Sequence, residues 1–270
     1  MLRKLLKYDL RYIFRYWWIA AAASLAASLL SAGCLSILQS ERSLPSAVYV
    51  MCTIILVLSM IGFIAFAIFG SVITFVRFYK NLFSDEGYLT FTLPVTMNDI
   101  IGAKLIAGVI ASVSSIVMMF VDIFLMLWIS VGEEIPEAIG DFFEECFEGV
   151  GFYFPLYAIE VIGIVIACIA LSTLFTYICI TLSCVVFKKA RVVLAIGVYY
   201  IVNNLFTIVV DMLSVFSSEA LSQWLVNVPL WQVNSTVGLM LLAIMLMCVI
   251  LGTVLYIIQH KLLQSKLNLA

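Results

Sequence analysis

The chain has 270 residues, of which 65% are hydrophobic and only 11% are charged. A soluble domain is typically about 45–50% apolar and about 25% charged, so these values exclude a water-soluble globular protein. Several apolar runs exceed the roughly 20 residues that a helix needs to cross a bilayer. The seven cysteines contain no C-x-x-C pair, and their odd number argues against a disulfide framework. The sequence therefore predicts an all-α integral membrane protein.

Six apolar segments are long enough to span a membrane. They are residues 17–38, 48–76, 106–131, 153–187, 192–216 and 237–259. Because backbone amides in lipid must be paired internally, runs of this length predict helices. The fourth segment is longer than one upright crossing requires, so we expect it to extend beyond the membrane or to bend near Pro155 or Gly163. Residues 1–270 are predicted to form a single transmembrane domain.

The distribution of Lys and Arg predicts the orientation of these spans. Thirteen of the 14 lie in the N-terminal segment, the second-to-third and fourth-to-fifth connections and the C-terminal tail, whereas Arg42 lies on the other side. Since positive charge concentrates in cytoplasmic segments, both termini are predicted to be cytoplasmic. We expect a multi-pass protein of the plasma membrane. Trp17 and Trp18 are expected to anchor the first span at the inner interface.

Residues 1–16 have the pattern of an amphipathic helix. Apolar side chains recur at three- and four-residue steps: Leu2, Leu5, Leu6, Leu10, Ile13 and Phe14. The cations occupy the opposite face: Arg3, Lys4, Lys7, Arg11 and Arg15. Such a helix is expected to lie in the headgroup plane, with its cations near anionic lipid or a docked protein. A purely topological anchor is the alternative.

The connection between the second and third spans, residues 77–101, is cytoplasmic by the charge pattern yet rich in large apolar side chains. These are Phe78, Tyr79, Leu82, Phe83, Tyr88, Leu89, Phe91 and Leu93. Ser84, followed by Asp85 and Glu86, favours the start of a short helix, and Pro94 ends it. A helix of this kind is suited to insert into a groove of another protein. A re-entrant or interfacial loop that packs on its own bundle is the alternative.

Two connections on the predicted outer side differ in character. Residues 132–151 contain seven acids and no base, with apolar residues at helical spacing, which indicates an amphipathic helix resting on the membrane. Its acidic face is interpreted either as a solvated surface or as a collector of cationic ligands. Residues 217–236 are nearly as apolar as a span but are interrupted by Pro229, which favours a re-entrant outer hairpin.

Polar residues within the spans offer a second candidate site. Asp122 falls in the third span, and Asn203 and Asn204 fall in the fifth. Ionisable groups at membrane depth are costly, so Asp122 is expected to face the bundle interior or water. These residues either line a substrate path or form structural hydrogen bonds between helices.

Catalytic and nucleotide-binding motifs are absent. The sequence has no G-x-x-x-x-G-K-[ST] and a single histidine, His260, near the C-terminal membrane edge. We therefore expect a non-catalytic chain that binds no cofactor, metal or nucleic acid itself.

The segment Ser84-Asp-Glu-Gly-Tyr-Leu-Thr-Phe-Thr-Leu-Pro94 resembles the permease subunits of ABC transporters of the type-2 exporter class, in particular the single-domain six-span permeases of Gram-positive bacteria. The likeness extends to the basic N-terminal helix, the six spans and the apolar hairpin before the last span. It implies a coupling helix that sits in a cleft of a separately encoded ATPase and contains Asp85, Glu86, Gly87, Tyr88, Leu89, Thr90 and Phe91. It also implies that the basic N-terminal helix is an interface helix touching the same ATPase.

The resemblance implies an ATP-driven exporter in which this chain provides the substrate path. ATP and Mg²⁺ are then bound by the partner subunit, and a second permease, identical or related, completes the unit. The substrate stays open among peptide antibiotics, other drugs and lipid-like molecules. Two alternatives are a proton- or ion-coupled secondary transporter that uses Asp122 and a non-transporting membrane sensor or scaffold.

Overall fold

The computed structural model describes residues 2–40, 45–84, 94–132, 134–186 and 230–267, together with 87, 90, 92, 194, 196–201 and 204. Its helices are α1 (Leu2–Gln39), α2 (Ser46–Phe83), α4 (Met97–Val131), α5 (Glu134–Val150), α6 (Phe154–Val186) and α8 (Leu230–Leu267), with the short 3₁₀ helix η1 (Gly151–Tyr153) before α6. No strand occurs among these described residues. The chain divides into two compact units, 1–81 with 92–149, and 82–91 with 150–270.

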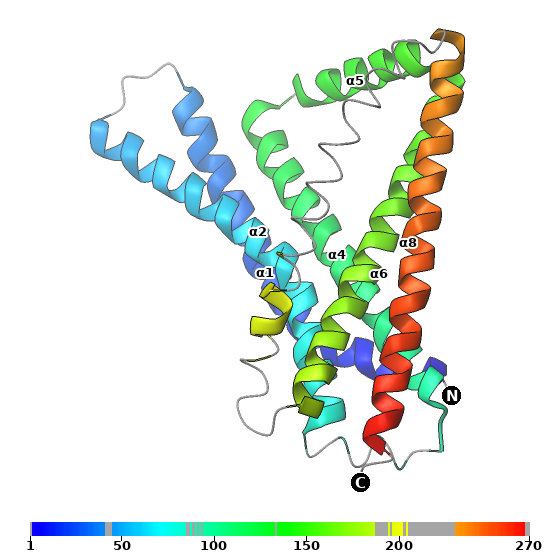
Figure 1. The fold of residues 1–270 in the computed structure, drawn as a ribbon. Coiled ribbons are helices and arrows are strands. Elements are labelled where there is room, and N and C mark those ends of the chain that lie inside the picture. The colour runs from blue at the N-terminus through cyan, green and yellow to red at the C-terminus, as the bar shows by residue number, and fades with distance from the viewer. Residues whose placement is uncertain are drawn as a thin grey trace. The chain divides into compact units, whose positions relative to one another are not determined.

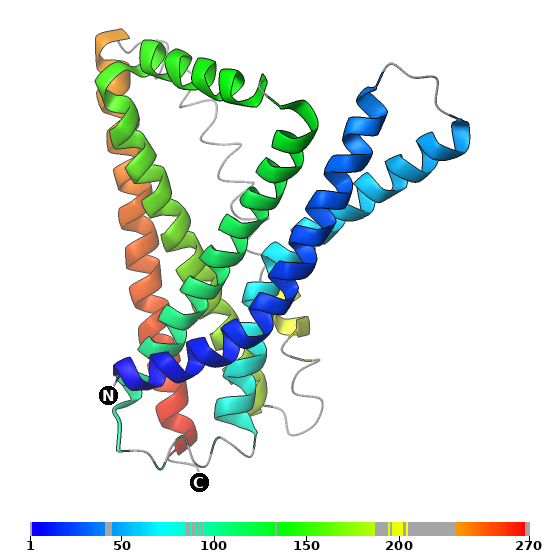
Figure 2. The same cartoon turned by 180° about the vertical axis from the view of Figure 1, so that it is seen from behind.

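Unit 1 contains α1, α2 as far as Asn81, α4, and α5 as far as Gly149. Trp17 and Phe66 bring α1 and α2 into contact, and Ser71 and Ser112 join α2 to α4 with 3.0 Å between their hydroxyl oxygens. Trp17 and Phe66 pack with Met118, whereas Ala32 and Phe63 pack with Met126. Residue numbers therefore rise together along α1 and α4 and fall along α2, so α1 and α4 run in the same direction and α2 runs against both. The helix α1 bends along its length, and its first turns lie across the start of α4 (Figure 2).

Small residues let α2 approach the backbone of α4 closely. A Cβ atom added to Gly70 would lie 2.5 Å from the backbone oxygen of Ala111 and closer still to Oγ of Ser115. Real Cβ atoms do not approach so near, so only glycine fits at this crossing. Helix association within a membrane depends on such close backbone contact, because lipid is as apolar as the side chains.

Trp17 is buried between the helices of unit 1. Its Nε1 donates a hydrogen bond to Oγ of Ser115 at 2.9 Å, and only 6% of its surface is exposed. The expectation that Trp17 anchors an interface is therefore wrong, because its indole fills the space beside Phe66 and Ala21. Trp18 points away from this core and is exposed, which agrees with an interface anchor.

Unit 2 contains α6 and α8, which lie side by side and run in the same direction (Figure 1). Gly238 of α8 lies beside Tyr157 of α6, and near the other end Gln259 donates to Oγ1 of Thr181 at 2.9 Å. The pair Gln259 and Thr181 is fully buried. Pro155 occupies the first turn of α6, where no backbone donor is needed, and α6 continues as helix to Val186.

Five helices within the described residues are long and apolar enough to cross a membrane, namely α1, α2, α4, α6 and α8. They coincide with the first, second, third, fourth and sixth predicted spans. The predicted fifth span, 192–216, lies mostly outside the described residues, so six spans and the orientation of the termini stay predictions. Residues 217–229 of the predicted outer hairpin also lie outside them, and residues 230–236 form the first turns of α8.

The predicted boundaries differ from the structure in two places. The basic segment 1–16 and the first span form one continuous helix, α1, and no break separates them. The connection predicted at 77–101 is shorter, because α2 continues to Phe83 and α4 begins at Met97. The side chain of Thr96 caps α4 by accepting from the backbone N of Asp99 at 3.2 Å.

Candidate functional site

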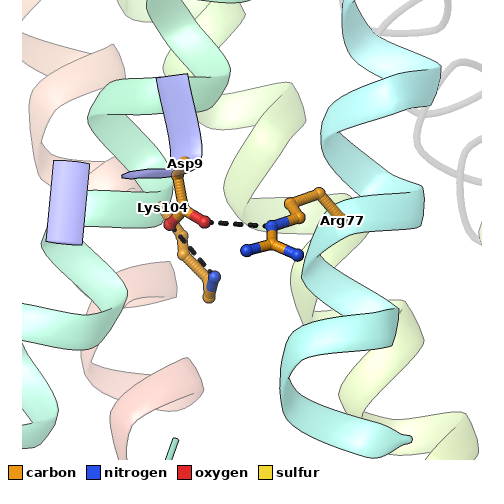
Figure 3. A network of polar contacts seen from close by, with 3 residues as sticks. All are labelled: Asp9, Arg77 and Lys104. Atoms are coloured by element: carbon orange, nitrogen blue, oxygen red, sulfur yellow. Dashed lines mark hydrogen bonds and ion pairs between the residues drawn. The ribbon is translucent and has the colours of Figure 1, made fainter. Parts of the chain in front are cut away.

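Three charged side chains meet near the starts of α1 and α4 and the end of α2. Asp9 of α1 accepts from Arg77 of α2, with 3.2 Å between Oδ1 and Nε, and from Lys104 of α4, with 3.2 Å between Oδ2 and Nζ. Figure 3 shows the two cations reaching the carboxylate from different helices. We call these three residues the Asp9 cluster.

The Asp9 cluster is withdrawn from solvent. Only 8% of the Asp9 side chain and 5% of the Lys104 side chain are exposed, against 18% for Arg77. The guanidinium carbon of Arg77 also lies 4.4 Å from the ring centroid of Tyr12, a distance that permits a cation–π interaction. Burying a charge is costly unless an opposite charge accompanies it, and here both cations lie 3.2 Å from an oxygen of the Asp9 carboxylate.

Helical periodicity places these charges on buried faces. Asp9 shares the apolar face of α1 with Leu6 and Ile13, and the basic residues of α1 occupy the other side. Lys104 shares the buried face of α4 with Gly108 and Ala111. One turn deeper, an apolar cluster is built from Ile13, Ile73, Ala107 and Ala111. The Asp9 cluster therefore lies one turn from this apolar cluster, and buried side chains also lie on its other side, Phe78 in α2 and Ile101 in α4.

The position of the Asp9 cluster in the chain connects it with the predicted coupling segment, 85–91. Arg77 lies before this segment near the end of α2, and Lys104 lies after it in α4. Both helices that bracket the segment are thus joined by ion pairs to the predicted interface helix, the first turns of α1.

Most predicted coupling residues lie outside the described residues: Asp85, Glu86, Tyr88, Leu89 and Phe91. Gly87 and Thr90 are described, and both are helical and buried. The backbone N of Gly87 donates to the backbone oxygen of Ser84 at 2.8 Å, and an added Cβ would lie 2.6 Å from the oxygen of Leu82. Only glycine fits so tight a turn at this position.

The first apolar residues of this connection are unsuited to docking. Phe78 and Leu82 are 1% and 2% exposed, and Phe83 is also buried. Their burial within the chain corrects the expectation that the whole apolar connection is available to a partner. Gly87 and Thr90, which follow Ser84, are buried as well, so the docking role stays a prediction for the rest of the segment.

The predicted cations of the interface helix are arranged as expected. Arg3, Lys4, Lys7, Arg11 and Arg15 are all exposed. The apolar side chains of the same turns are buried or half-buried, with Ile13 1% exposed. The basic face is therefore open, while the opposite face packs in unit 1.

Asp122 is fully buried in α4, between the apolar clusters around Trp17 and around Ala32. Neither of its carboxylate oxygens has a hydrogen-bond partner among the described residues. Ser24 of α1 is the neighbouring hydroxyl, but it donates to the backbone oxygen of Ala21 at 2.9 Å. The expectation that Asp122 faces the interior of a helix bundle is met.

The other polar residues of the spans mainly bond within their own helices. Nδ2 of Asn204 donates to the backbone oxygen of Tyr200 at 2.7 Å, and Asn203 lies outside the described residues. Thr173 and Thr176 donate to carbonyls one turn earlier in α6. Asp122 belongs to unit 1 and Asn204 to unit 2, and their common role in a substrate path stays a prediction.

The Asp9 cluster was not predicted from the sequence. The signal was present, because Asp9 is the one acid on the apolar face of a basic amphipathic helix, and Lys104 shares a face with Gly108 and Ala111. Within the described part of the chain, no three His, Cys, Asp or Glu side chains gather as a metal site.

The long apolar helices define the class, a multi-pass α-helical membrane protein. No known protein family, curated protein or solved structure matches the chain.

Proposed function

We propose that this chain is the permease subunit of an ATP-driven ABC exporter of the type-2 class, non-catalytic itself and coupled to a separately encoded ATPase. The observation that carries the proposal is the Asp9 cluster, which joins the basic start of α1 to both helices that bracket the segment 85–91. The likeness of Ser84–Pro94 to the coupling segment of such permeases supplies the identity of the partner.

The mechanism follows from these contacts. Closure of two nucleotide-loaded ATPases displaces the segment 85–91, and this displacement enters α2 and α4. The ion pairs from Asp9 carry the same movement to α1, so the three helices shift together. The ATPase can change the permease only through contacts that differ between its two states. A second permease completes the path, and ATP and Mg²⁺ stay on the ATPase.

The first test concerns the coupling segment. Tyr88→Asp and Leu89→Asp are expected to reduce the amount of P-loop ATPase that co-purifies with the chain by about tenfold or more, because loss of an anchor in a desolvated groove costs about 2 kcal/mol or more. The ATPase is the one encoded beside this chain, co-expressed and measured per mole of permease together with its ATP turnover.

Tyr49→Asp is the matched control, because Tyr49 is 57% exposed at the other end of α2. It is expected to retain the ATPase in full. Equal retention of the ATPase by Tyr88→Asp, Leu89→Asp and Tyr49→Asp contradicts the coupling role. Failure of any ATPase to co-purify with the unaltered chain contradicts the transporter proposal as a whole.

A second candidate function rests on Asp122. A carboxyl group that is fully buried and has no hydrogen-bond partner among the described residues has the character of a proton- or cation-coupling site in a secondary transporter. The structural alternative is a buried group that only specifies how α1 and α4 pack.

Proton flux distinguishes the two functions. In proteoliposomes with a valinomycin-imposed K⁺ potential and an internal pH dye, the ABC proposal predicts background proton uptake for both the unaltered chain and Asp122→Asn. ATP-independent uptake that Asp122→Asn abolishes would establish the secondary transporter instead. Asn has nearly the same volume as Asp, so loss of uptake without loss of folded protein would report the missing ionisable group.

A further inference from the structure

The helix α5 has two chemically opposite faces, and the described residues bury neither of them. One face exposes large apolar side chains: Ile139, Phe142, Phe143 and Phe147. The other exposes acids throughout its length: Glu134, Glu137, Asp141, Glu144, Glu145 and Glu148. Phe142 is 59% exposed and Phe147 is 52% exposed, far more than a core aromatic. Ile139 and Phe142 therefore face whatever surrounds the helix.

The segments on either side of α5 fix its depth in a membrane. Just before it, α4 ends at Val131, and Gly132 turns the chain with a φ of 70°. Trp128, in the last turn of α4, is 46% exposed, and Tyr153, three residues beyond the end of α5, is 44% exposed. Exposed Trp and Tyr at the ends of spans mark the headgroup level. Both ends of α5 are therefore connected to positions at that level.

The level of α5 favours a membrane over a second copy of the chain as the occupant. Exposed Trp128 and Tyr153 place both ends of the helix at headgroup depth, where acyl chains lie directly beneath an apolar face. The acids lie on the opposite face, and α5 contains no base. A lipid interface leaves this acidic face in water. Six acids also disfavour anionic headgroups, so the favoured surface is zwitterionic.

We propose that α5 lies in the bilayer interface at the end of unit 1 opposite the Asp9 cluster, with its phenylalanines among the upper acyl chains of zwitterionic lipids. The proposal is independent of the transport function. It assigns to α5 the role of a lipid-binding helix that holds the end of α4 at the membrane surface.

Two positions on opposite faces of α5 provide the test. Cys146 lies on the apolar side and Glu144 on the acidic side. An environment-sensitive NBD label is placed at Cys146, or at Glu144→Cys with Cys146→Ala, in a chain whose other six cysteines are replaced by Ala. Both proteins are studied in phosphatidylcholine nanodiscs, with acrylamide as the aqueous quencher and a shallow doxyl-lipid as the membrane quencher.

The label at 146 is expected to emit at shorter wavelength, to be quenched by the doxyl-lipid and to be several-fold less sensitive to acrylamide than the label at 144. Replacing a third of the phosphatidylcholine by phosphatidylglycerol is expected to increase acrylamide quenching at 146. Equal acrylamide quenching at both positions would overturn the proposal. Protection of 146 from both quenchers would also overturn it, in favour of a protein occupant.

A measurement on the unaltered chain covers the case in which the cysteine-replaced protein does not fold. A phosphatidylcholine with a photoactivatable diazirine near its glycerol is expected to cross-link to α5 peptides that contain Phe142, Phe143 and Phe147. Absence of cross-links to α5, with cross-links present on the exposed apolar surface of α8, would contradict the proposal.

Discussion

Asp9→Asn is expected to lower the free energy of unfolding by about 3 kcal/mol, because it removes the negative charge that lies between the buried ammonium group of Lys104 and the half-buried guanidinium of Arg77. Asn has nearly the same volume as Asp, so the loss reports charge and not packing. The measurement is an equilibrium unfolding titration with SDS in mixed micelles, followed by helical circular dichroism. Asp9→Glu is expected to recover part of the lost free energy because it restores the carboxylate.

Two further variants make this prediction specific. Lys7→Ala alters an exposed charge on the same helix and is expected to change the free energy of unfolding by less than about 0.5 kcal/mol. A double-mutant cycle between Asp9→Asn and Lys104→Met is expected to show a coupling energy between about 0.5 and 3 kcal/mol. An Asp9→Asn protein as stable as Lys7→Ala, with additive effects in the cycle, would show that the cluster does not hold the helices together.

Gly70→Ala is expected to destabilise unit 1 by about 1–3 kcal/mol through overpacking at the crossing of α2 and α4. The added methyl group meets the backbone oxygen of Ala111, which no rotamer change can move, and also Oγ of Ser115. Since Ser115 accepts the hydrogen bond of Trp17, the clash is transmitted to α1 as well. The measurement is the same unfolding titration, with tryptophan fluorescence as a second signal.

Gly62 is the matched control, because it lies on the same helix and an added Cβ would meet nothing within 4 Å. Gly62→Ala is expected to be neutral or slightly stabilising, since Ala favours a helix by up to about 1 kcal/mol relative to Gly. Equal stability of the Gly70→Ala and Gly62→Ala proteins would show that α2 and α4 are not in such close contact.

The helices were predictable from the sequence because their signals are local. A run such as 106–131 is apolar for long enough to require a helix in lipid, and α4 contains that run. The acidic segment predicted at 132–151 forms α5 between Glu134 and Val150, as its spacing indicates. The exposed cations of α1 follow in the same way from a period of 3.6 residues. Helix ends were less well predicted. No strong stop signal precedes Phe83, where α2 ends, but Thr96 followed three residues later by Asp99 is a local start signal for α4 that the predicted connection 77–101 overlooked.

The candidate site was only partly predictable. Local pattern identified the basic face of α1 and the buried carboxyl group of Asp122. It assigned Phe78 and Leu82 to a docking surface, yet the chain buries both, because an apolar side chain looks the same in sequence whichever surface covers it. The proposed partner-facing residues after Ser84 rest on the resemblance of the segment and not on local pattern.

By itself, the sequence determined that this is a membrane protein, that it is helical, and which charges its two amphipathic segments carry. Each of these properties depends on composition and on spacing along one helix. The tertiary structure alone decided which residues meet: Asp9 with Arg77 and Lys104, Trp17 with Ser115, and Gly70 with the backbone of α4. The partners of Asp9 lie 68 and 95 residues away in sequence. Such pairs depend on the rotation and register of one helix against another, which no local periodicity specifies.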